Sequence, residues 1–196
     1  MMPTLRGAAA VERAREVGAR LFAEHGYSET TTRQLSAAIG ITNGTFYHHF
    51  SSKEDLLRRV SEGALAEIDA AVRAAIADVN DPVQRVETLV RTHLSVIAGS
   101  KDAHTVMLVE LRALRGTNRE VVIAARDAYE NIVKDVVEHG QVAGELRRDL
   151  DGATLARLLL NLMNWTIFWF EPDGDLSVDE LADRMLAVFL DGARTP

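Results

Sequence analysis

The stretch TTTRQLSAAIGITNGTFYHHFSSKEDLL, residues 30–57, decides the fold of this chain. Thr31 and Gln34 have the spacing of a capping box, which opens a short helix that Gly40 ends. Thr42 can cap a second, very short helix. Two short helices joined by so tight a turn form a helix-turn-helix, a motif whose second helix lies in the major groove of DNA.

The side chains of this second helix suit contact with a duplex. Gly44 allows close approach of the backbone, and Thr45 offers a hydroxyl and a methyl group to base edges. Phe46 and Phe50, four residues apart, are expected to anchor the opposite face of the helix to a core. Lys53, at the start of the next helix, is placed for a phosphate. The predicted DNA-binding residues are Thr31, Thr32, Arg33, Thr42, Asn43, Gly44, Thr45, Tyr47, His48 and Lys53.

A packing module of three helices without a ligand is the alternative interpretation of this stretch. No metal site is expected, because the adjacent His48 and His49 point about 100° apart on a helix. The stretch also has no HExxH motif and no third ligand at a useful spacing. His49 is expected to pack or to cap rather than to contact bases.

Residues 30–57 resemble the DNA-binding signature of the TetR family of bacterial transcriptional regulators. The resemblance extends to the preceding ARLFAEHGYSETT, and Ser36 departs from it where the family usually has alanine. It implies an all-α homodimer of nine helices with a C-terminal domain that binds a small molecule. The matching residues are Thr31, Gly40, Ile41, Thr42, Gly44, Tyr47, Phe50, Lys53, Glu54 and Leu56.

Apolar periodicity and helix caps predict helices throughout the chain and no strand. One helix is expected over 8–25, and a second capping box, Ser51-x-x-Glu54, is expected to open a long helix to about residue 79. Later helices are expected over about 82–97, 102–114, 117–143, 153–170 and 178–191, opened in part by Asp81-Pro82, Thr117-x-x-Glu120 and Ser177-x-x-Glu180. The prediction is an all-α fold of about nine helices. A helix-turn-helix DNA-binding domain is expected over 1–52, and a ligand-binding and dimerisation domain over 53–196.

Composition and charge limit the classes of protein to which this chain can belong. The 196 residues are 47% apolar and contain no cysteine, which suits a sizeable core and excludes disulfides and thiolate metal sites. Residues 1–60 hold 8 Lys/Arg against 6 Asp/Glu, whereas residues 61–196 hold 14 against 23. This pattern indicates a weakly basic module on an acidic body. No signal peptide or membrane span is found, so a cytoplasmic location is expected.

The helix ARLLLNLMNWTIFWF, residues 156–170, is apolar almost all round. Such a helix is buried on every side, which in a chain of this size implies a partner. With the last helix it is expected to form a four-helix bundle across a two-fold axis, and a monomeric core helix is the alternative. The predicted dimer interface contains Leu155, Leu159, Met163, Leu181, Met185, Val188 and Phe189.

The same body is expected to hold an apolar cavity with a few polar groups. The predicted lining is Met107, Leu111, Tyr129, Ile132, Met163, Phe168 and Trp169, with Asn161 and Asn164 as polar tips, and ordinary core packing is the alternative. Residues 165–192 resemble the C-terminal domain of a TetR subgroup that senses acyl-CoA thioesters. That resemblance implies a hydrophobic effector, either an acyl-CoA or a drug-like molecule. Arg112, Arg115, Arg147 and Arg148 are the candidates to meet CoA phosphates.

The predicted function is a ligand-responsive regulator, most simply a repressor that binds a palindromic operator as a dimer and is released by its effector. No GxSxG, GxGxxG or P-loop motif is present, so neither an enzyme nor a cofactor is expected. An effector-independent DNA-binding or architectural protein is the main alternative. An enzyme with an unrecognised all-α site also remains open.

Overall fold

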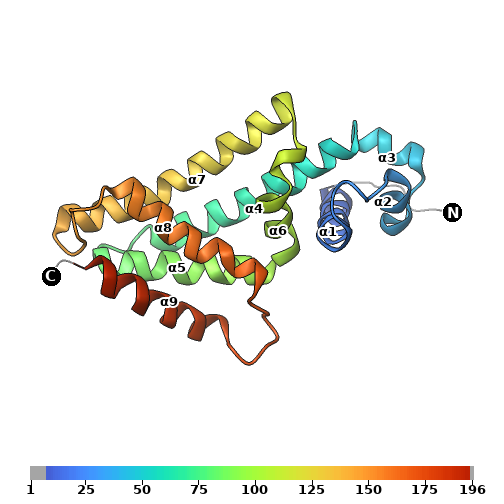
Figure 1. Cartoon of the computed structure of the whole chain (residues 1–196). Coiled ribbons are helices and arrows are strands. Elements are labelled where there is room, and N and C mark those ends of the chain that lie inside the picture. The colour runs from blue at the N-terminus through green and yellow to red at the C-terminus, as the bar shows by residue number, and fades with distance from the viewer. Residues whose placement is uncertain (1–7, 195–196) are drawn as a thin grey trace. The chain divides into compact units, whose positions relative to one another are not determined.

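The structure, a computed structural model, describes residues 8–194, so the ends of both expected domains lie outside the described residues. The described chain forms nine α-helices, two short 3-10 helices and no strand, which confirms the all-α prediction (Figure 1). The α-helices are α1 (Ala8–His25), α2 (Thr32–Ile39), α3 (Asn43–His49), α4 (Lys53–Ile76), α5 (Pro82–Gly99), α6 (Lys101–Val109), α7 (Gly116–Ala143), α8 (Gly152–Asn164) and α9 (Val178–Ala193). The 3-10 helices are η1 (Leu111–Ala113) and η2 (Trp165–Phe168).

The chain divides into two compact units that are not consecutive in sequence. Of the described residues, 8–64 and 101–125 form unit 1, and 65–100 and 126–194 form unit 2. Helices α4 and α7 each begin in unit 1 and continue into unit 2. The helix-turn-helix expected within residues 1–52 therefore shares its unit with α6, η1 and the first turns of α7.

In unit 1, α1 packs against α2 and α6, and α2 packs against α3. Three aromatic side chains, Phe22, Phe46 and Phe50, are fully buried at the centre of this packing. Helix α2 ends at Gly40, whose φ of +81° is a left-handed conformation that glycine adopts without strain. Ile41 follows in the turn and is buried.

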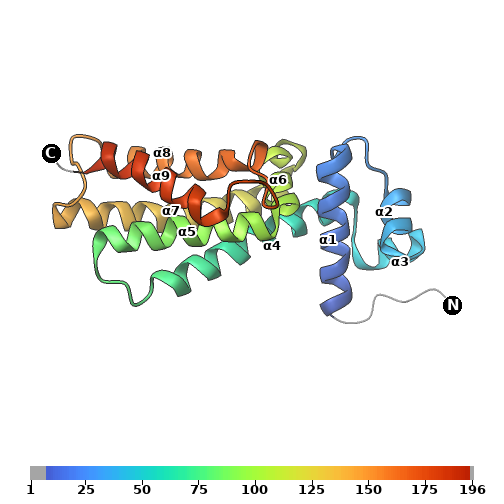
Figure 2. The same cartoon turned by 90° about the horizontal axis from the view of Figure 1, so that it is seen from below.

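In unit 2, α5, α8 and α9 lie side by side (Figure 2). Their facing sides bury Leu89, Leu159 and Phe189, which form part of one apolar core. A polar pair is also buried in this unit, because His93 Nδ1 lies 2.7 Å from the hydroxyl of Tyr129. Burial strongly raises the pKa of the Tyr129 phenol, so this hydroxyl stays protonated.

Most predicted helix boundaries are confirmed, but the start of α4 is shifted. The capping boxes of Thr31 with Gln34 and of Ser177 with Glu180 are both present. The box predicted for Ser51-x-x-Glu54 is wrong, because Ser52 Oγ accepts the N–H of Asp55 at 3.0 Å. The Asp55 carboxylate in turn accepts the N–H of Ser51 at 3.1 Å. Ser52 thus caps the first turn, whereas the Asp55 carboxylate bonds the preceding serine, so no reciprocal box forms between one serine and one acid.

Three other helices also differ from the prediction. The helix expected over 102–114 ends as α-helix at Val109, and the separate 3-10 helix η1 follows it. Helix α7 begins at Gly116 rather than at Thr117. The helix expected over 153–170 runs as α-helix only to Asn164 and continues as the 3-10 turn of η2.

Candidate nucleic-acid interface

Helix α3 is held at its start by a threonine cap and on its inner face by aromatic packing. Thr42 Oγ1 accepts the N–H of Thr45 at 3.1 Å and lies 2.9 Å from the Thr45 hydroxyl. The rings of Phe46 and Phe50 are buried with their centroids 5.2 Å apart. Packing of this face leaves the opposite side of α3 at the surface. The exposed residues there are Asn43, Gly44, Tyr47 and His48.

The start of α2 adds polar groups to the same surface. Thr31 and Arg33 are exposed, and the hydroxyl of Tyr47 lies 3.4 Å from Thr32 Oγ1. This contact brings the first turn of α2 beside the middle of α3. Nine of the ten predicted DNA-binding residues therefore come from two adjoining helix segments, α2 and α3 with their caps, and the tenth is Lys53.

Gly44 has no internal neighbour that requires a glycine. A methyl group built on its Cα meets nothing closer than Thr42 Oγ1 at 3.8 Å, an ordinary contact, and its φ is not left-handed. Glycine inside a helix costs about 1 kcal/mol relative to alanine. Neither the packing of unit 1 nor the backbone conformation explains this residue.

Lys53 faces the protein rather than an open surface. Its ammonium group donates to the carbonyl oxygens of Tyr27, Ser28 and Thr30 at 2.7, 3.4 and 2.8 Å. It also lies 4.2 Å from the centroid of the Tyr27 ring. Burial lowers the pKa of Lys53, whereas Glu29 and Glu110 act in the opposite direction. Lys53 thus fixes the loop that leads into α2, and its three donors are used within the protein.

Two carboxylates that sequence reasoning missed join the 110–118 segment to the helix-turn-helix. Glu110 Oε1 accepts the N–H of Tyr27 at 3.0 Å. Glu54 Oε1 accepts the N–H of Arg115 at 2.9 Å and the side-chain amide of Asn118 at 3.0 Å. The partners are 83 and 61 residues apart in sequence for the two backbone contacts, so no local pattern could have indicated them.

The predicted effector residues do not gather within one unit. Met107 and Leu111 belong to unit 1, whereas the other predicted lining residues belong to unit 2. In unit 2, Tyr129 is buried, Asn164 is half-buried, and Asn161, Phe168 and Trp169 are exposed. Tyr129 therefore faces the core of unit 2, whereas Phe168 and Trp169 at the end of η2 face outward.

An open apolar groove of about 990 Å³ runs along α8, η2 and α9. Five of the seven predicted interface residues line it, namely Leu155, Leu181, Met185, Val188 and Phe189. The other two, Leu159 and Met163, are fully buried inside unit 2. The most exposed apolar side chains in the groove are instead Leu158, Leu162, Trp165, Trp169 and Val188.

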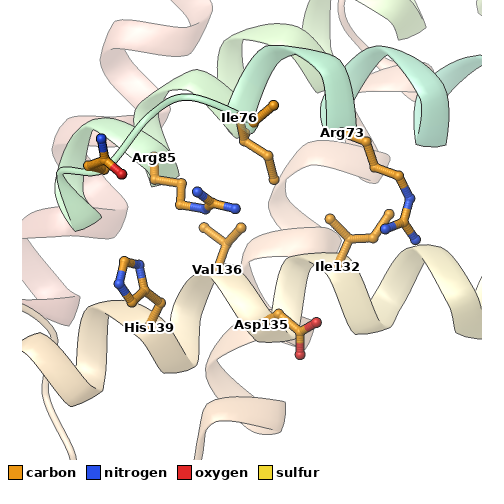
Figure 3. A pocket seen from close by; sticks show the side chains of 9 residues that line it. Arg73, Ile76, Arg85, Ile132, Asp135, Val136 and His139 are labelled. Atoms are coloured by element: carbon orange, nitrogen blue, oxygen red, sulfur yellow. The ribbon is translucent and has the colours of Figure 1, made fainter.

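A second, more polar pocket of about 540 Å³ lies between the end of α4, the start of α5 and the C-terminal half of α7 (Figure 3). Ile76, Ile132 and Val136 form its apolar part. Arg85 donates to the carbonyl oxygen of Val79 at 2.9 Å. Of the predicted effector residues, only Ile132 lies here.

Residues 8–194 contain neither a membrane span nor a metal cluster. No helix in that range is long and apolar enough to cross a membrane. No group of three or more histidine, aspartate or glutamate side chains in that range is arranged to hold a metal ion.

Comparison with known proteins covers both parts of the chain. The family described as "Bacterial regulatory proteins, tetR family" matches residues 15–60, and "Tetracyclin repressor-like, C-terminal domain" matches residues 79–193. The HTH-type transcriptional repressor KstR2 of Rhodococcus jostii (strain RHA1) is 30% identical over 182 residues, which are 92% of this chain and 89% of that protein.

Solved structures give the same result. The TetR family transcriptional regulator PfmR from Thermus thermophilus superposes with a TM-score of 0.85 and 32% identity, over 91% of this chain and 97% of that chain. AibR in complex with isovaleryl coenzyme A and operator DNA superposes with a TM-score of 0.84 and 26% identity, over 91% and 97% of the two chains.

Proposed function

Since this chain belongs to the TetR family of bacterial regulatory proteins, which are transcriptional regulators and not enzymes, we propose that it is a repressor released from its operator by a small molecule. Helix α3 enters the major groove, where Asn43 and Thr45 meet base edges. Thr31, Arg33 and His48 meet phosphates on either side. Because its target is chromosomal DNA, the protein works in the cytoplasm.

The observation that carries this proposal is Gly44. A solvent-exposed glycine in a helix of seven residues is a cost that the protein's own packing does not explain. Close approach of another molecule's backbone does explain it, because a Cβ would hold α3 away from the floor of the groove.

The experiment that tests this function compares Gly44→Ala with Gly99→Ala. Gly99 is also helical and exposed, and a Cβ built there meets nothing within 4 Å. Both variants should be as stable as the parent or more stable, since alanine favours helix. Only Gly44→Ala should lose affinity for labelled DNA fragments that the parent selects from its source genome, by at least about tenfold. Equal affinity in both variants would contradict entry of α3 into the groove.

We further propose that a second copy of the chain covers the apolar groove of unit 2. Val188 is 70% exposed and Trp165 is 66% exposed, and a monomer rarely leaves so large an apolar patch in water. Two copies of α8 and α9 related by a two-fold axis form a four-helix bundle. Within this interface Leu158 and Leu162 replace Leu159 and Met163, which fill the protomer's own core. Such a dimer requires a palindromic operator with half-sites about one helical turn apart.

The proposed effector is a small hydrophobic molecule, with acyl-CoA thioesters as the first class to test. Support comes from AibR, whose structure contains isovaleryl coenzyme A together with operator DNA. Within this chain, His104 of α6 is 0% exposed, and neither of its ring nitrogens has a hydrogen-bond partner among the described residues. A buried polar group without a partner is costly, and a bound molecule can supply the missing hydrogen bond.

Helix α6 is placed to pass the effect of a bound molecule to the DNA-binding helices. It packs on α1 within unit 1. Directly after it, Glu110 holds the N–H of Tyr27 in the loop that leads to α2. A shift of α6 would therefore displace α1 and this loop, and would alter the presentation of α3. Coupling of about 1–3 kcal/mol is ordinary for such a switch.

A further inference from the structure

A buried serine contacts both helices of the DNA-binding motif. Ser36 lies on α2 and is 3% exposed. Its Oγ lies 2.7 Å from the carbonyl oxygen of Thr32. The same Oγ lies 3.1 Å from Oδ1 of the Asn43 side-chain amide. Asn43 is the first residue of α3, and it is exposed on the face assigned to DNA.

Both of these partner atoms are oxygens, which can only accept a hydrogen bond. The Ser36 hydroxyl has a single proton, so it cannot donate to both of them at once. The 2.7 Å distance to Thr32 is typical of an O–H···O bond, for which the usual range is about 2.5–3.0 Å. The 3.1 Å distance to Asn43 exceeds that range and fits an N–H···O bond, which extends to about 3.2 Å. The proton of Ser36 therefore belongs to the bond with Thr32.

The side-chain oxygen and nitrogen of an asparagine exchange places when the amide turns by about 180°, and the hydrogen bonds decide between the two orientations. We infer that Ser36 fixes the Asn43 amide with Nδ2 donating to Ser36 Oγ and with Oδ1 directed away from α2. In this orientation the carbonyl oxygen of Asn43 is presented to the groove. The role of this orientation in DNA recognition rests on the proposed function, whereas the hydrogen bond between Ser36 and Asn43 does not.

An oxygen acceptor selects among base edges. In the major groove, adenine N6 and cytosine N4 carry the exocyclic amines that can donate to it, whereas guanine offers only acceptors there. Ser36, which touches no base, is thus a positioning residue for specificity, and it makes Asn43 favour adenine or cytosine at the facing position. Without Ser36 the Asn43 amide can present either its oxygen or its NH2 group to the groove, so it can hydrogen-bond to any of the four bases.

The orientation is tested first in the DNA-free protein by nuclear magnetic resonance. An NOE is expected between the Asn43 side-chain NH2 protons and the Ser36 Hβ protons. Ser36→Ala should shift the NH2 signals of Asn43 to solvent-exposed values. Ser61→Ala is the matched control, because Ser61 is equally buried and bonds the carbonyl oxygen of Leu57 at 3.0 Å. Asn43 signals that are the same in all three proteins would overturn the inference.

The consequence is tested by selecting half-sites from randomised duplexes with the same three proteins. On the strand that faces Asn43, the parent and Ser61→Ala should enrich adenine or cytosine over guanine or thymine, and Ser36→Ala should lose that preference by on the order of tenfold. Affinity for non-specific duplex should be equal in all three, because no phosphate contact changes. An unaltered preference in Ser36→Ala would overturn the role in specificity. If none of the proteins selects any half-site but the NOE is present, the proposed function fails while the Ser36–Asn43 bond stands.

Discussion

The ammonium group of Lys53 lies 2.7 Å from the carbonyl oxygen of Tyr27, across 26 residues of sequence. It also bonds the carbonyl oxygens of Ser28 and Thr30, so the first turn of α4 is tied to the whole loop between α1 and α2. The Glu110 carboxylate accepts the N–H of the same residue, Tyr27. The loop that leads into α2 is therefore fixed by two charged residues, one in the first turn of α4 and one in the bend after α6.

Replacement of Lys53 by methionine keeps the aliphatic chain and removes the ammonium. We expect a loss of about 1–2 kcal/mol in the free energy of unfolding, because carbonyl oxygens lose a charged donor that is only partly screened. Operator affinity should fall by the same factor at every salt concentration, with the slope of log K against log [salt] unchanged.

The control for Lys53→Met is Arg33→Ala. Arg33 is exposed at the start of α2, and the loss of its phosphate contact should reduce the salt slope by about 1. If Lys53→Met also reduced the slope of log K against log [salt], Lys53 would contact a DNA phosphate, as the sequence alone suggests.

Charge placed in the apolar groove should separate the dimer. Trp165→Glu buries two unpaired carboxylates near a two-fold axis, which costs several kcal/mol, and should give monomers in sedimentation. Val142→Glu is the control, since Val142 is 76% exposed on α7 and does not line the groove.

The same interface should be visible in fluorescence. The chain has two tryptophans, Trp165 and Trp169, and both line the groove. Emission of the parent protein should therefore shift to longer wavelength on dilution, as the two copies separate. A dimer that survives Trp165→Glu would refute this interface.

The buried imidazole of His104 should make the free energy of unfolding fall as the pH falls. Burial lowers the pKa of His104 to about 4, whereas the unfolded chain takes up a proton near pH 6.5. Between these values the unfolded state binds more protons, so stability falls as the pH falls. From about pH 7.5 to about pH 5.0 this group alone should remove about 2 kcal/mol.

Urea unfolding of the parent and of His104→Leu, at equal protein concentration, measures this contribution. The variant should lose about 2 kcal/mol less than the parent between the two pH values. At the higher pH it should also be more stable than the parent without effector, because no buried nitrogen is left without a partner. Parallel pH profiles would contradict a buried neutral imidazole at this position.

Removal of the Glu110 carboxylate should weaken the response to effector more than DNA binding itself. Glu110→Ala deletes the acceptor for the N–H of Tyr27, and we expect about a fivefold smaller effect of an active acyl-CoA on operator affinity. Isovaleryl coenzyme A is the first thioester to test. Glu120→Ala, on the exposed side of α7, is the control. An undiminished response in Glu110→Ala would exclude this route of coupling.

Local patterns were sufficient to predict most of the fold. Caps such as Thr31 with Gln34, and glycines such as Gly26 and Gly40, act within a few residues, so the sequence displays them directly. The start of α4 was misplaced because Ser51 and Ser52 are both followed three residues later by an acid. Only the backbone geometry decides which serine accepts the N–H of the residue three positions later.

The sequence predicts a DNA-binding surface and a dimer interface, but not every residue that belongs to each. In an all-round apolar helix such as α8, no pattern separates the stripe of Leu159 and Met163, which faces the protomer's core, from the stripe of Leu158 and Leu162, which faces outward. The role of Lys53 depends on a loop that lies far from it in sequence. Such contacts arise from tertiary packing, which no local spacing encodes.

The central claim is that α3, presented twice by a symmetric dimer, binds specific double-stranded DNA. The most direct test is selection of fragments from the source genome by the purified, effector-free protein at low ionic strength. Strong enrichment of a few fragments that share an inverted repeat, with half-sites about one helical turn apart, is the predicted result. Recovery of all fragments in proportion to their input would contradict it.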